Sequence, residues 1–194
     1  MGRRRQDTFG RRAAAEGWEA RSVYKLEEVQ RRARILRQGQ RVLDLGCHPG
    51  SWSQFTRRQI GRHGHLVGVD ITPTPHLAGE FLHGSVLDVT PEQLLEALGG
   101  PADVVLSDMA PNTTGDRVGD HLRQIELARA ALQLAIGVLV PGGTFVTKVF
   151  EGGESAEFVA SARPHFGKVK RMRPKAVRKE SREWFLVCTQ AKGL

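Results

Sequence analysis

Charged side chains recur at or near the ends of short apolar segments of this chain. Each segment has the length and composition of a buried strand. Because the carboxyl ends of parallel strands meet at one edge of a sheet, where α/β proteins bind ligands, we expect these side chains to surround one binding site. A carboxylate at this edge can accept hydrogen bonds from a ligand. An amine inside an apolar strand is costly to bury unless an opposite charge or a ligand binds to it. The residues are Asp44, Asp70, Asp88, Asp108 and Lys148.

A glycine turn follows the first of these segments. The stretch 41–54 reads R-V-L-D-L-G-C-H-P-G-S-W-S-Q, which predicts a strand, a turn and a helix start. Gly46 and Gly50 bracket the turn, where glycine permits positive φ or close approach of a ligand, and Ser51 is the predicted N-cap. The D-x-G-x-x-x-G spacing from Asp44 differs from the G-x-G-x-x-G fingerprint of dinucleotide binders. It resembles the first motif of S-adenosylmethionine-dependent methyltransferases, and an ordinary glycine turn is the alternative.

Two further acids are predicted to bind the adenosine part of such a ligand. Asp70 lies near the end of the segment 65–71, where doubly wound nucleotide binders place an acid that accepts hydrogen bonds from both ribose hydroxyls. Asp88 ends a weaker segment, 81–88, and we predict that it accepts a hydrogen bond from the adenine amino group.

The elements that must position these residues alternate between strands and helices. Strands are predicted at residues 41–45, 65–71, 81–88, 102–108, 144–150, 168–173 and 184–189. Helices are predicted at residues 21–35 with Ser22 as N-cap, 51–60, 91–98 after a Thr90/Gln93 capping box, 121–139 ended by Pro141-Gly142-Gly143, and 154–163. This order predicts an α/β protein with an open, mostly parallel sheet and an antiparallel edge strand. The resemblance of the glycine turn to S-adenosylmethionine-dependent methyltransferases implies their Rossmann-like fold, with a seven-stranded sheet and helices on both faces.

Length and composition narrow the class of protein. The chain has 194 residues and no internal repeat or linker, which predicts a basic N-terminal extension at 1–20 and a single domain at 21–194. No apolar run is long enough to cross a membrane and no secretory signal is recognisable. The two cysteines, Cys47 and Cys188, lie far apart in apolar settings, as is typical of a reducing compartment. We therefore expect a cytoplasmic protein.

The net charge of +8 is unevenly distributed. Residues 1–40 hold eleven Lys/Arg against five Asp/Glu, residues 41–162 hold eight against fourteen, and residues 163–194 hold ten against two. Basic ends that meet in space would form a phosphate-binding surface beside an acidic ligand site, and a genomic bias toward arginine is the alternative. The candidate RNA-binding residues are Arg11, Arg12, Arg21, Lys175, Arg178, Lys179 and Arg182.

The chemistry that these residues favour is methyl transfer to an alcohol. Transfer from a sulfonium is an in-line displacement that needs alignment and an activated acceptor. His63 and His65 form the only close histidine pair, outside any Cys/His cluster, and no G-x-S-x-G motif indicates a hydrolase. The segment after Asp108 lacks both the Pro-Pro-aromatic motif of base N-methyltransferases and the cysteine of cytosine C5 enzymes. An alcohol acceptor needs a base, which Lys148 would supply.

Five motifs, in order along nearly the whole chain, resemble the FtsJ-like ribosomal RNA 2'-O-ribose methyltransferases. They are R-S-V-Y-K-L at 21–26, L-D-L-G-C-H-P-G-S-W-S-Q at 43–54, L-S-D-M-A-P-N at 106–112, V-T-K at 146–148 and R-K-E-S-R-E at 178–183. The resemblance implies a K-D-K-E tetrad at Lys25, Asp108, Lys148 and Glu183. By itself, Lys25 would be a solvated side chain, and Glu183 a strand-edge partner of Arg182 or Lys179.

The resemblance also implies S-adenosylmethionine as cofactor, with contacts from Gly50, Trp52, Asp70, Asp88 and Asp108. Cys47, His48 and Ser51 stand where family members usually have two small residues and a second glycine, so His48 either contacts the cofactor or covers the turn. The full predicted cofactor set is Asp44, Gly46, His48, Gly50, Trp52, Asp70, Asp88 and Asp108.

The implied reaction transfers a methyl group from S-adenosylmethionine to a ribose 2'-hydroxyl in RNA, without a metal. Lys148 is the base, Asp108 orients it and faces the sulfonium, and Lys25 and Glu183 position the ribose. The implied target is a uridine in the A loop of large-subunit (23S-type) ribosomal RNA, and we expect a monomer. The alternatives are a tRNA or mRNA-cap ribose methyltransferase and, from another class, an RNA-binding ribosome-assembly factor with a vestigial cofactor site. The intact tetrad argues against the assembly factor.

Overall fold

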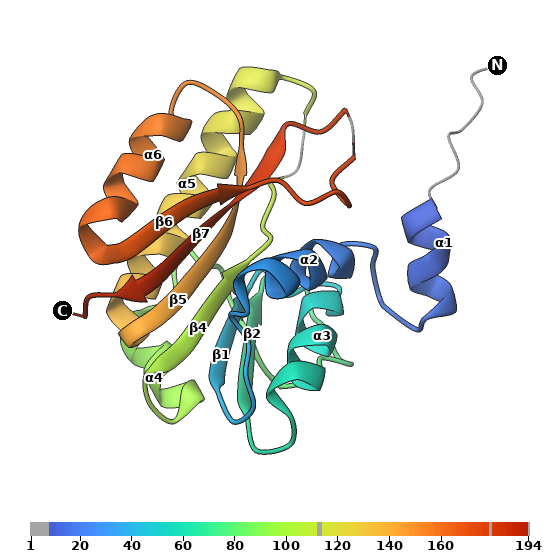
Figure 1. The fold of residues 1–194 in the computed structure, drawn as a ribbon, viewed down its shortest axis with the longest axis vertical. Coiled ribbons are helices and arrows are strands. Elements are labelled where there is room, and N and C mark those ends of the chain that lie inside the picture. Colours follow the sequence, from blue (N-terminus) through green and yellow to red (C-terminus); the bar gives the residue numbers. More distant parts are fainter. Residues whose placement is uncertain (1–7, 112–113, 179, 194) are drawn as a thin grey trace.

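A seven-stranded sheet runs through the residues that the computed structural model describes, 8–111, 114–178 and 180–193 (Figure 1). The strands lie in the order β3-β2-β1-β4-β5-β7-β6. Their bounds are β1 Arg41–Leu45, β2 His65–Asp70, β3 Glu80–His83, β4 Ala102–Ser107, β5 Leu139–Phe150, β6 Phe166–Met172 and β7 Glu183–Ala191. The helices are α1 Thr8–Ala15, α2 Val23–Ala33, α3 Ser51–Ile60, α4 Pro91–Leu98, α5 Arg117–Val138 and α6 Ser155–Ala162, followed by the 3-10 helix η1 Arg163–His165.

Antiparallel pairing is confined to one edge of this sheet. Strands β3, β2, β1, β4 and β5 pair in parallel, whereas β7 runs antiparallel to both of its neighbours, β5 and β6. The connection 173–182 between β6 and β7 is too short for the crossover that parallel neighbours require, so these strands form a hairpin. The predicted fold class is confirmed, with β7 second from the edge and β6 outermost.

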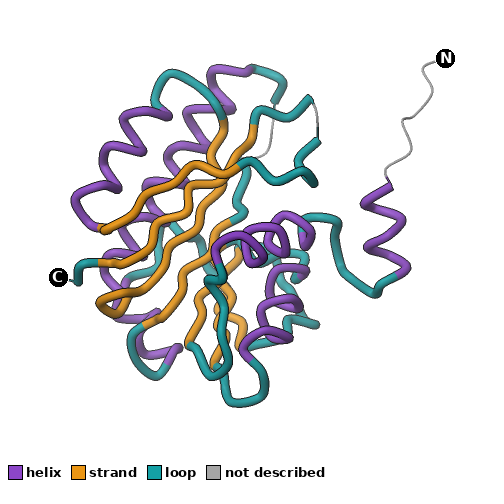
Figure 2. The backbone as a smooth tube through the Cα atoms, viewed as in Figure 1, coloured by secondary structure: helices purple, strands orange, loops and turns teal. Residues whose placement is uncertain are grey.

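Alternate strand residues face two separate cores. In β1, Leu43 and Leu45 belong to the core that α4, α5 and α6 cover, and Val42 belongs to the core that α2 and α3 cover. Helices lie on both sides of the strands, as expected for a largely parallel sheet (Figure 2). Helix α1, which the apolar spacing does not predict, buries Ala13 in the second core, so part of the predicted extension is packed against the domain.

Three element boundaries differ from those predicted. Helix α5 begins at Arg117, because the Asp116 side chain accepts a hydrogen bond from the Val118 N–H and caps it there. Strand β5 begins at Leu139, which pairs with Ala102 of β4, so the Pro-Gly-Gly segment belongs to a strand and does not end the helix. Strand β3 ends at His83, so the prediction that Asp88 ends a strand is wrong.

Of the three predicted N-caps, Thr90 is confirmed, Ser22 is confirmed in position although its side chain forms no capping hydrogen bond, and Ser51 is wrong. Thr90 and Gln93 form the capping box that starts α4. Gly50, at φ 111°, holds the N-cap position of α3, so Ser51 is the first helical residue. The Ser22 side chain does not cap α2, because its hydroxyl forms a hydrogen bond with the Ser51 hydroxyl at 2.8 Å. Within the described ranges, no helix has the length and apolar character needed to cross a membrane.

Candidate active site

A cavity of about 300 Å³ opens where β1, β2 and β4 end, and we call it the strand-end cavity. Four of the predicted cofactor residues line it: Gly46, His48, Asp70 and Asp108. The turns at 84–86 and 109–110 supply most of its remaining wall. The expectation that acids at the carboxyl ends of parallel strands meet at one site is therefore met by Asp70 and Asp108.

Asp70 links the two loops that border the strand-end cavity. Its Oδ2 accepts a hydrogen bond from the His48 N–H at 2.9 Å, and its Oδ1 accepts one from the Thr72 N–H at 2.7 Å. Each carboxylate oxygen can accept a second hydrogen bond, so the side chain can still bind ligand hydroxyls. Asp70 thus both shapes the cavity and offers acceptors to it.

Gly46 is required by the shape of the cavity wall. It has a positive φ of 75°, and a Cβ at this position would overlap the Met109 side chain, which also lines the cavity. Any larger residue would displace Met109 or the turn. Gly50 is constrained in a different way, since its φ of 111° favours glycine although the space around it is open enough for a Cβ.

Asp44 lies beneath the turn and does not line the cavity. Its side chain is buried, and its Oδ2 accepts a hydrogen bond from the Ser53 hydroxyl at 2.6 Å. Burial raises the pKa of Asp44 to about 7, because the charged form loses hydration that one hydroxyl only partly replaces. Asp44 therefore supports the glycine turn from below, through its hydrogen bond with Ser53.

Four predicted cofactor residues do not line the strand-end cavity: Asp44 and Gly50, described above, and Trp52 and Asp88. Trp52 is 3% exposed, donates its indole N–H to the Ser22 carbonyl oxygen at 2.9 Å and packs against Phe185. Asp88 is exposed in a turn beyond β3, where the cavity is lined instead by Ser85 and Val86. The structure thus places Trp52 as a packing residue between helices α2 and α3 and strand β7.

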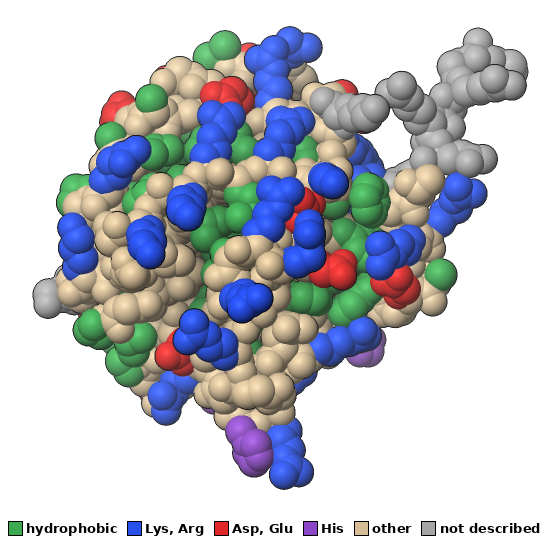
Figure 3. Space-filling model, viewed as in Figure 1, with side chains coloured by type: hydrophobic (Ala, Val, Ile, Leu, Met, Phe, Trp, Pro, Cys, Tyr) green, Lys and Arg blue, Asp and Glu red, His purple; other side chains and the backbone are tan. Residues whose placement is uncertain are grey.

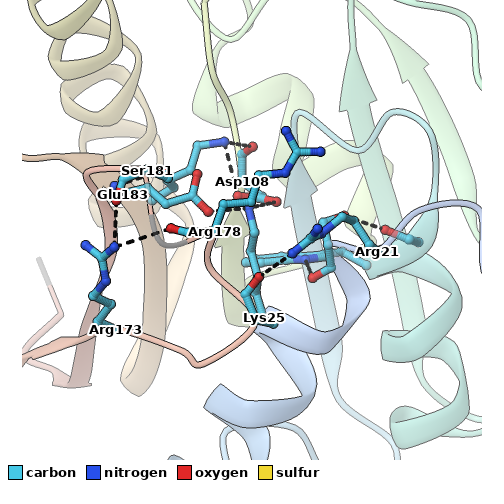
Figure 4. A network of polar contacts seen from close by, with 12 residues as sticks. Arg21, Lys25, Asp108, Arg173, Arg178, Ser181 and Glu183 are labelled. Atoms are coloured by element: carbon cyan, nitrogen blue, oxygen red, sulfur yellow. Dashed lines mark hydrogen bonds and ion pairs between the residues drawn. The ribbon is translucent and has the colours of Figure 1, made fainter. Parts of the chain in front are cut away.

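The four tetrad residues come from separate parts of the chain, and Figure 4 shows three of them, Lys25, Asp108 and Glu183, close together. Lys25 is on α2, Asp108 follows β4, Lys148 is in β5 and Glu183 begins β7. The Lys25 Nζ lies 2.7 Å from Glu183 Oε1 and 3.7 Å from Asp108 Oδ2. The Lys148 Nζ lies 3.1 Å from Asp108 Oδ1. Asp108 therefore stands between the two lysines.

Hydrogen bonds hold both the side-chain amine and the backbone carbonyl of Lys148 in place. Its Nζ donates to the Asp108 carbonyl oxygen at 2.6 Å, and its own carbonyl oxygen accepts from Gln124 Nε2 at 2.6 Å. The Gln124 Oε1 in turn accepts from the Phe150 N–H at 2.9 Å. Gln124 is a residue that sequence reasoning missed, although an amide within the apolar stripe of a predicted helix was a usable signal.

Lys25 is held as a cation. Burial lowers its pKa, but the carboxylates of Asp108 and Glu183 more than offset this effect and raise the pKa above the ordinary value for lysine. Lys25 therefore carries a fixed positive charge between two acids. Its local sequence alone suggests a solvated side chain without such partners.

A second cavity, of about 400 Å³, adjoins the tetrad, and we call it the loop cavity. One wall comes from the start of α2, with Arg21, Ser22 and Lys25. The other wall comes from the connection between β6 and β7, and it includes Arg178, Ser181 and Glu183. Because Lys25 contacts Asp108, the tetrad spans the space between the loop cavity and the strand-end cavity.

The predicted RNA-binding residues divide into two groups. The exposed side chains are those of Arg11, Arg12, Lys175, Arg178 and Arg182, whereas Arg21 is half-buried and Lys179 lies outside the described residues. Arg12 forms an ion pair with Glu16 at 2.7 Å and lies over the Tyr24 ring, and Arg21 donates to the Ala176 carbonyl oxygen at 2.8 Å. Lys and Arg side chains are spread over the face that carries α2, β6 and β7, with few acids among them (Figure 3).

Solved structures define the class of this fold. A ribosomal RNA methyltransferase from Plasmodium falciparum matches with a TM-score of 0.78 and 26% identity, covering 91% of this chain and all of that one. Fibrillarin from Aeropyrum pernix, solved with S-adenosyl-L-methionine bound, matches with a TM-score of 0.62 and 15% identity over 87% of this chain and 76% of that one. The second likeness bears on the fold alone. The fold is that of a Rossmann-like methyltransferase.

The chain belongs to the FtsJ-like methyltransferase family, whose model matches residues 18–191. Ribosomal RNA large subunit methyltransferase E from Desulfatibacillum aliphaticivorans is 42% identical over 97% of this chain and 92% of its own length. The protein of the same name from Caulobacter vibrioides is 44% identical over 96% of this chain and 83% of its own length. The predictions of the family and of an S-adenosylmethionine-dependent methyltransferase are confirmed.

Proposed function

We propose that this chain transfers a methyl group from S-adenosylmethionine to a ribose 2'-hydroxyl of large-subunit ribosomal RNA, at a uridine of the A loop. The observation that carries the proposal is the position of the tetrad between two cavities, with Asp108 lining one and Lys25 and Glu183 lining the other. A donor and an acceptor bound in adjoining cavities would meet at these four side chains. The relatives named as ribosomal RNA large subunit methyltransferases support the choice of RNA.

The residues around the strand-end cavity fit the cofactor. Asp108 lines this cavity with a carboxylate whose buried Oδ1 has the Lys148 Nζ as its ion-pair partner at 3.1 Å, and Gly46 leaves room that a Cβ would fill. Asp70 would accept hydrogen bonds from the ribose hydroxyls, as its remaining lone pairs allow. The bound cofactor supplies an electrophilic methyl group on a cationic sulfur, and the Asp108 carboxylate favours that positive charge nearby. Asp88 is not among the residues that line the cavity, so its contact with adenine is not part of the proposal.

Lys148 acts on the acceptor. Its amine, in the neutral form, takes the proton of the 2'-hydroxyl at Nζ as the oxygen attacks, which makes the oxygen a better nucleophile. Asp108 fixes the amine through its carbonyl and carboxylate oxygens, at 2.6 and 3.1 Å. The backbone of Lys148 is fixed as well, because Gln124 of α5 donates a hydrogen bond to its carbonyl oxygen. Proper alignment of the hydroxyl is expected to supply much of the rate.

Lys25 and Glu183 position the ribose. Their 2.7 Å ion pair places a cation and an acceptor side by side at the floor of the loop cavity. Such a pair can hold neighbouring hydroxyl and ring oxygens of one sugar by complementary hydrogen bonds. Arg178, Arg182 and Lys175, which are exposed around this opening, would bind the flanking phosphates. That the enzyme is a cytoplasmic monomer stays a prediction.

Mapping ribose methylation in cells with and without the gene tests this proposal. We expect one 2'-O-methyl group to be missing from large-subunit ribosomal RNA, and to return when the wild-type gene is restored. A gene carrying Lys148→Ala, produced at the same level, should not restore it. A missing methyl group in transfer RNA or at a messenger cap, or on a base, would refute the assigned acceptor.

A further inference from the structure

The connection 173–182 forms one wall of the loop cavity and is held against α2 by two polar contacts. The Lys175 N–H donates to Glu28 Oε2 at 2.6 Å. The Arg21 Nη2 donates to the Ala176 carbonyl oxygen at 2.8 Å. Two adjacent residues of the connection are therefore attached, one to α2, which also carries Lys25, and one to Arg21 just before that helix.

Glu28 belongs to none of the motifs or tetrad positions described above. It lies one turn after Lys25 on α2 and is only 8% exposed. A buried carboxylate is costly unless it is paired, and Glu28 forms an ion pair with Arg32 on the same helix. Its other oxygen takes the Lys175 N–H, and a charged acceptor makes such a hydrogen bond stronger than a neutral one would.

The rest of the connection transmits this attachment to the cavity. Ala176 and Val177 are buried in the core that α2 covers. The Arg173 Nη2 donates to the carbonyl oxygens of Arg178 and Ser181, at 3.4 and 2.6 Å, which folds the connection upon itself (Figure 4). A displacement at Lys175 would therefore move the cavity wall as far as Ser181, two residues before Glu183.

We propose that Glu28 is a positioning residue for the acceptor. By holding the backbone of Lys175 against α2, it sets the distance between Lys25 and the opposite wall of the loop cavity. Glu28 lines neither cavity and its polar contacts among the described residues are to Lys175, Arg31 and Arg32, so it acts on acceptor binding and not on cofactor binding. This inference rests on the proposed function only in naming a ribose as the group that enters the loop cavity.

Three variants test the role of Glu28. Glu28→Ala removes the acceptor, Glu28→Gln keeps an oxygen for the Lys175 N–H, and Glu27→Ala removes an exposed carboxylate from the neighbouring position as a control. Hydrogen exchange of the free proteins measures opening of the connection, calorimetry measures cofactor affinity, and methyl transfer to large ribosomal subunits gives KM and kcat.

We expect Glu28→Ala to speed exchange at residues 175–178 and to raise KM for subunits about tenfold, the equivalent of one lost hydrogen bond. Cofactor affinity should stay within about twofold, Glu28→Gln should show a smaller defect than Glu28→Ala because it keeps a weaker, neutral acceptor, and Glu27→Ala should change nothing. Unchanged exchange in Glu28→Ala would overturn the inference, and so would an equal defect in Glu28→Gln or an equal loss of cofactor affinity. Failure of the wild type to methylate subunits would refute the proposed function instead, and exchange would then decide the role of Glu28.

Discussion

The Lys148 Nζ lies 2.6 Å from the carbonyl oxygen of Asp108 and 3.1 Å from its Oδ1, so one residue holds the amine through both backbone and side chain. Lys148 is 5% exposed, and a neutral amine that donates its two N–H groups to these oxygens keeps its lone pair for an acceptor's proton. A lysine held this way is oriented before any acceptor arrives. This geometry favours proton transfer as its role, since a residue supplying charge alone would not need so defined a direction.

Lys148→Ala should lower single-turnover methyl transfer by a factor on the order of 10²–10⁴, the usual contribution of a general base. Lys148→Arg should be nearly as defective, because guanidinium does not release its proton at working pH. RNA and cofactor affinities, measured in parallel, should change far less. Lys168→Arg, at an exposed position of edge strand β6, is the matched control. Near-normal activity of Lys148→Arg would show that only a positive charge is needed at this position.

Asp70→Ala should weaken S-adenosylmethionine binding by about 1–3 kcal/mol, through the loss of hydrogen bonds to the ribose and of support for the His48 turn. Isothermal titration calorimetry measures this directly. The control is Asp103→Ala, which removes a comparable hydrogen bond, to the Arg41 N–H at 2.8 Å, near the opposite ends of the strands. Equal effects of the two substitutions would mean that Asp70 supports the fold without binding the cofactor.

RNA affinity should fall steeply as salt rises, and neutral substitutions at Lys175 and Arg178 should each flatten the slope of log K against log salt by about 0.7–0.9. Cofactor affinity should stay unchanged. Arg62→Ala, an exposed substitution in the turn between α3 and β2, should leave the slope as it is. Binding titrations at several salt concentrations provide the measurement. A slope that does not move with Lys175 or Arg178 would place the phosphate-binding surface elsewhere.

Asp44 should make the protein less stable as pH rises from about 4 to 7. Its pKa is raised by burial from 3.8 to about 7. Between these values the unfolded chain loses the proton while the folded chain keeps it, so the free energy of unfolding falls as pH rises and levels off above pH 7. Asp44→Asn has no such group, and its stability relative to wild type should rise over this range by at most about 4 kcal/mol.

Urea unfolding of both proteins at several pH values checks this prediction. Ser53→Ala provides a second comparison, because removing the hydroxyl that lowers the Asp44 pKa should extend the fall in stability to higher pH. A difference between wild type and Asp44→Asn that does not depend on pH would mean that Asp44 has the same pKa in the folded and unfolded states.

Local pattern in the sequence was sufficient for most of the fold and for part of the site. The apolar runs of β1, β2 and β4 and the capping box of α4 depend on neighbours in the chain, so they could be predicted from spacing. Asp70, Asp108 and Lys148 could be placed together for the same reason, since the carboxyl ends of parallel strands share one edge. Lys25 and Glu183 required the resemblance to the family, because nothing in their local sequence distinguishes them from solvated side chains.

Tertiary structure alone decided the contacts between elements that are remote in sequence. It brought Lys25 within 2.7 Å of Glu183, turned Trp52 toward Phe185, and attached Glu28 to the backbone of Lys175. Pairing with β4 also drew residues 139–143 into β5, against the turn tendency of Pro-Gly-Gly. The physical reason is common to all four. A helix face or a strand end is set by local spacing, whereas the partner of a buried charge depends on how separate elements pack, which no short stretch of sequence contains.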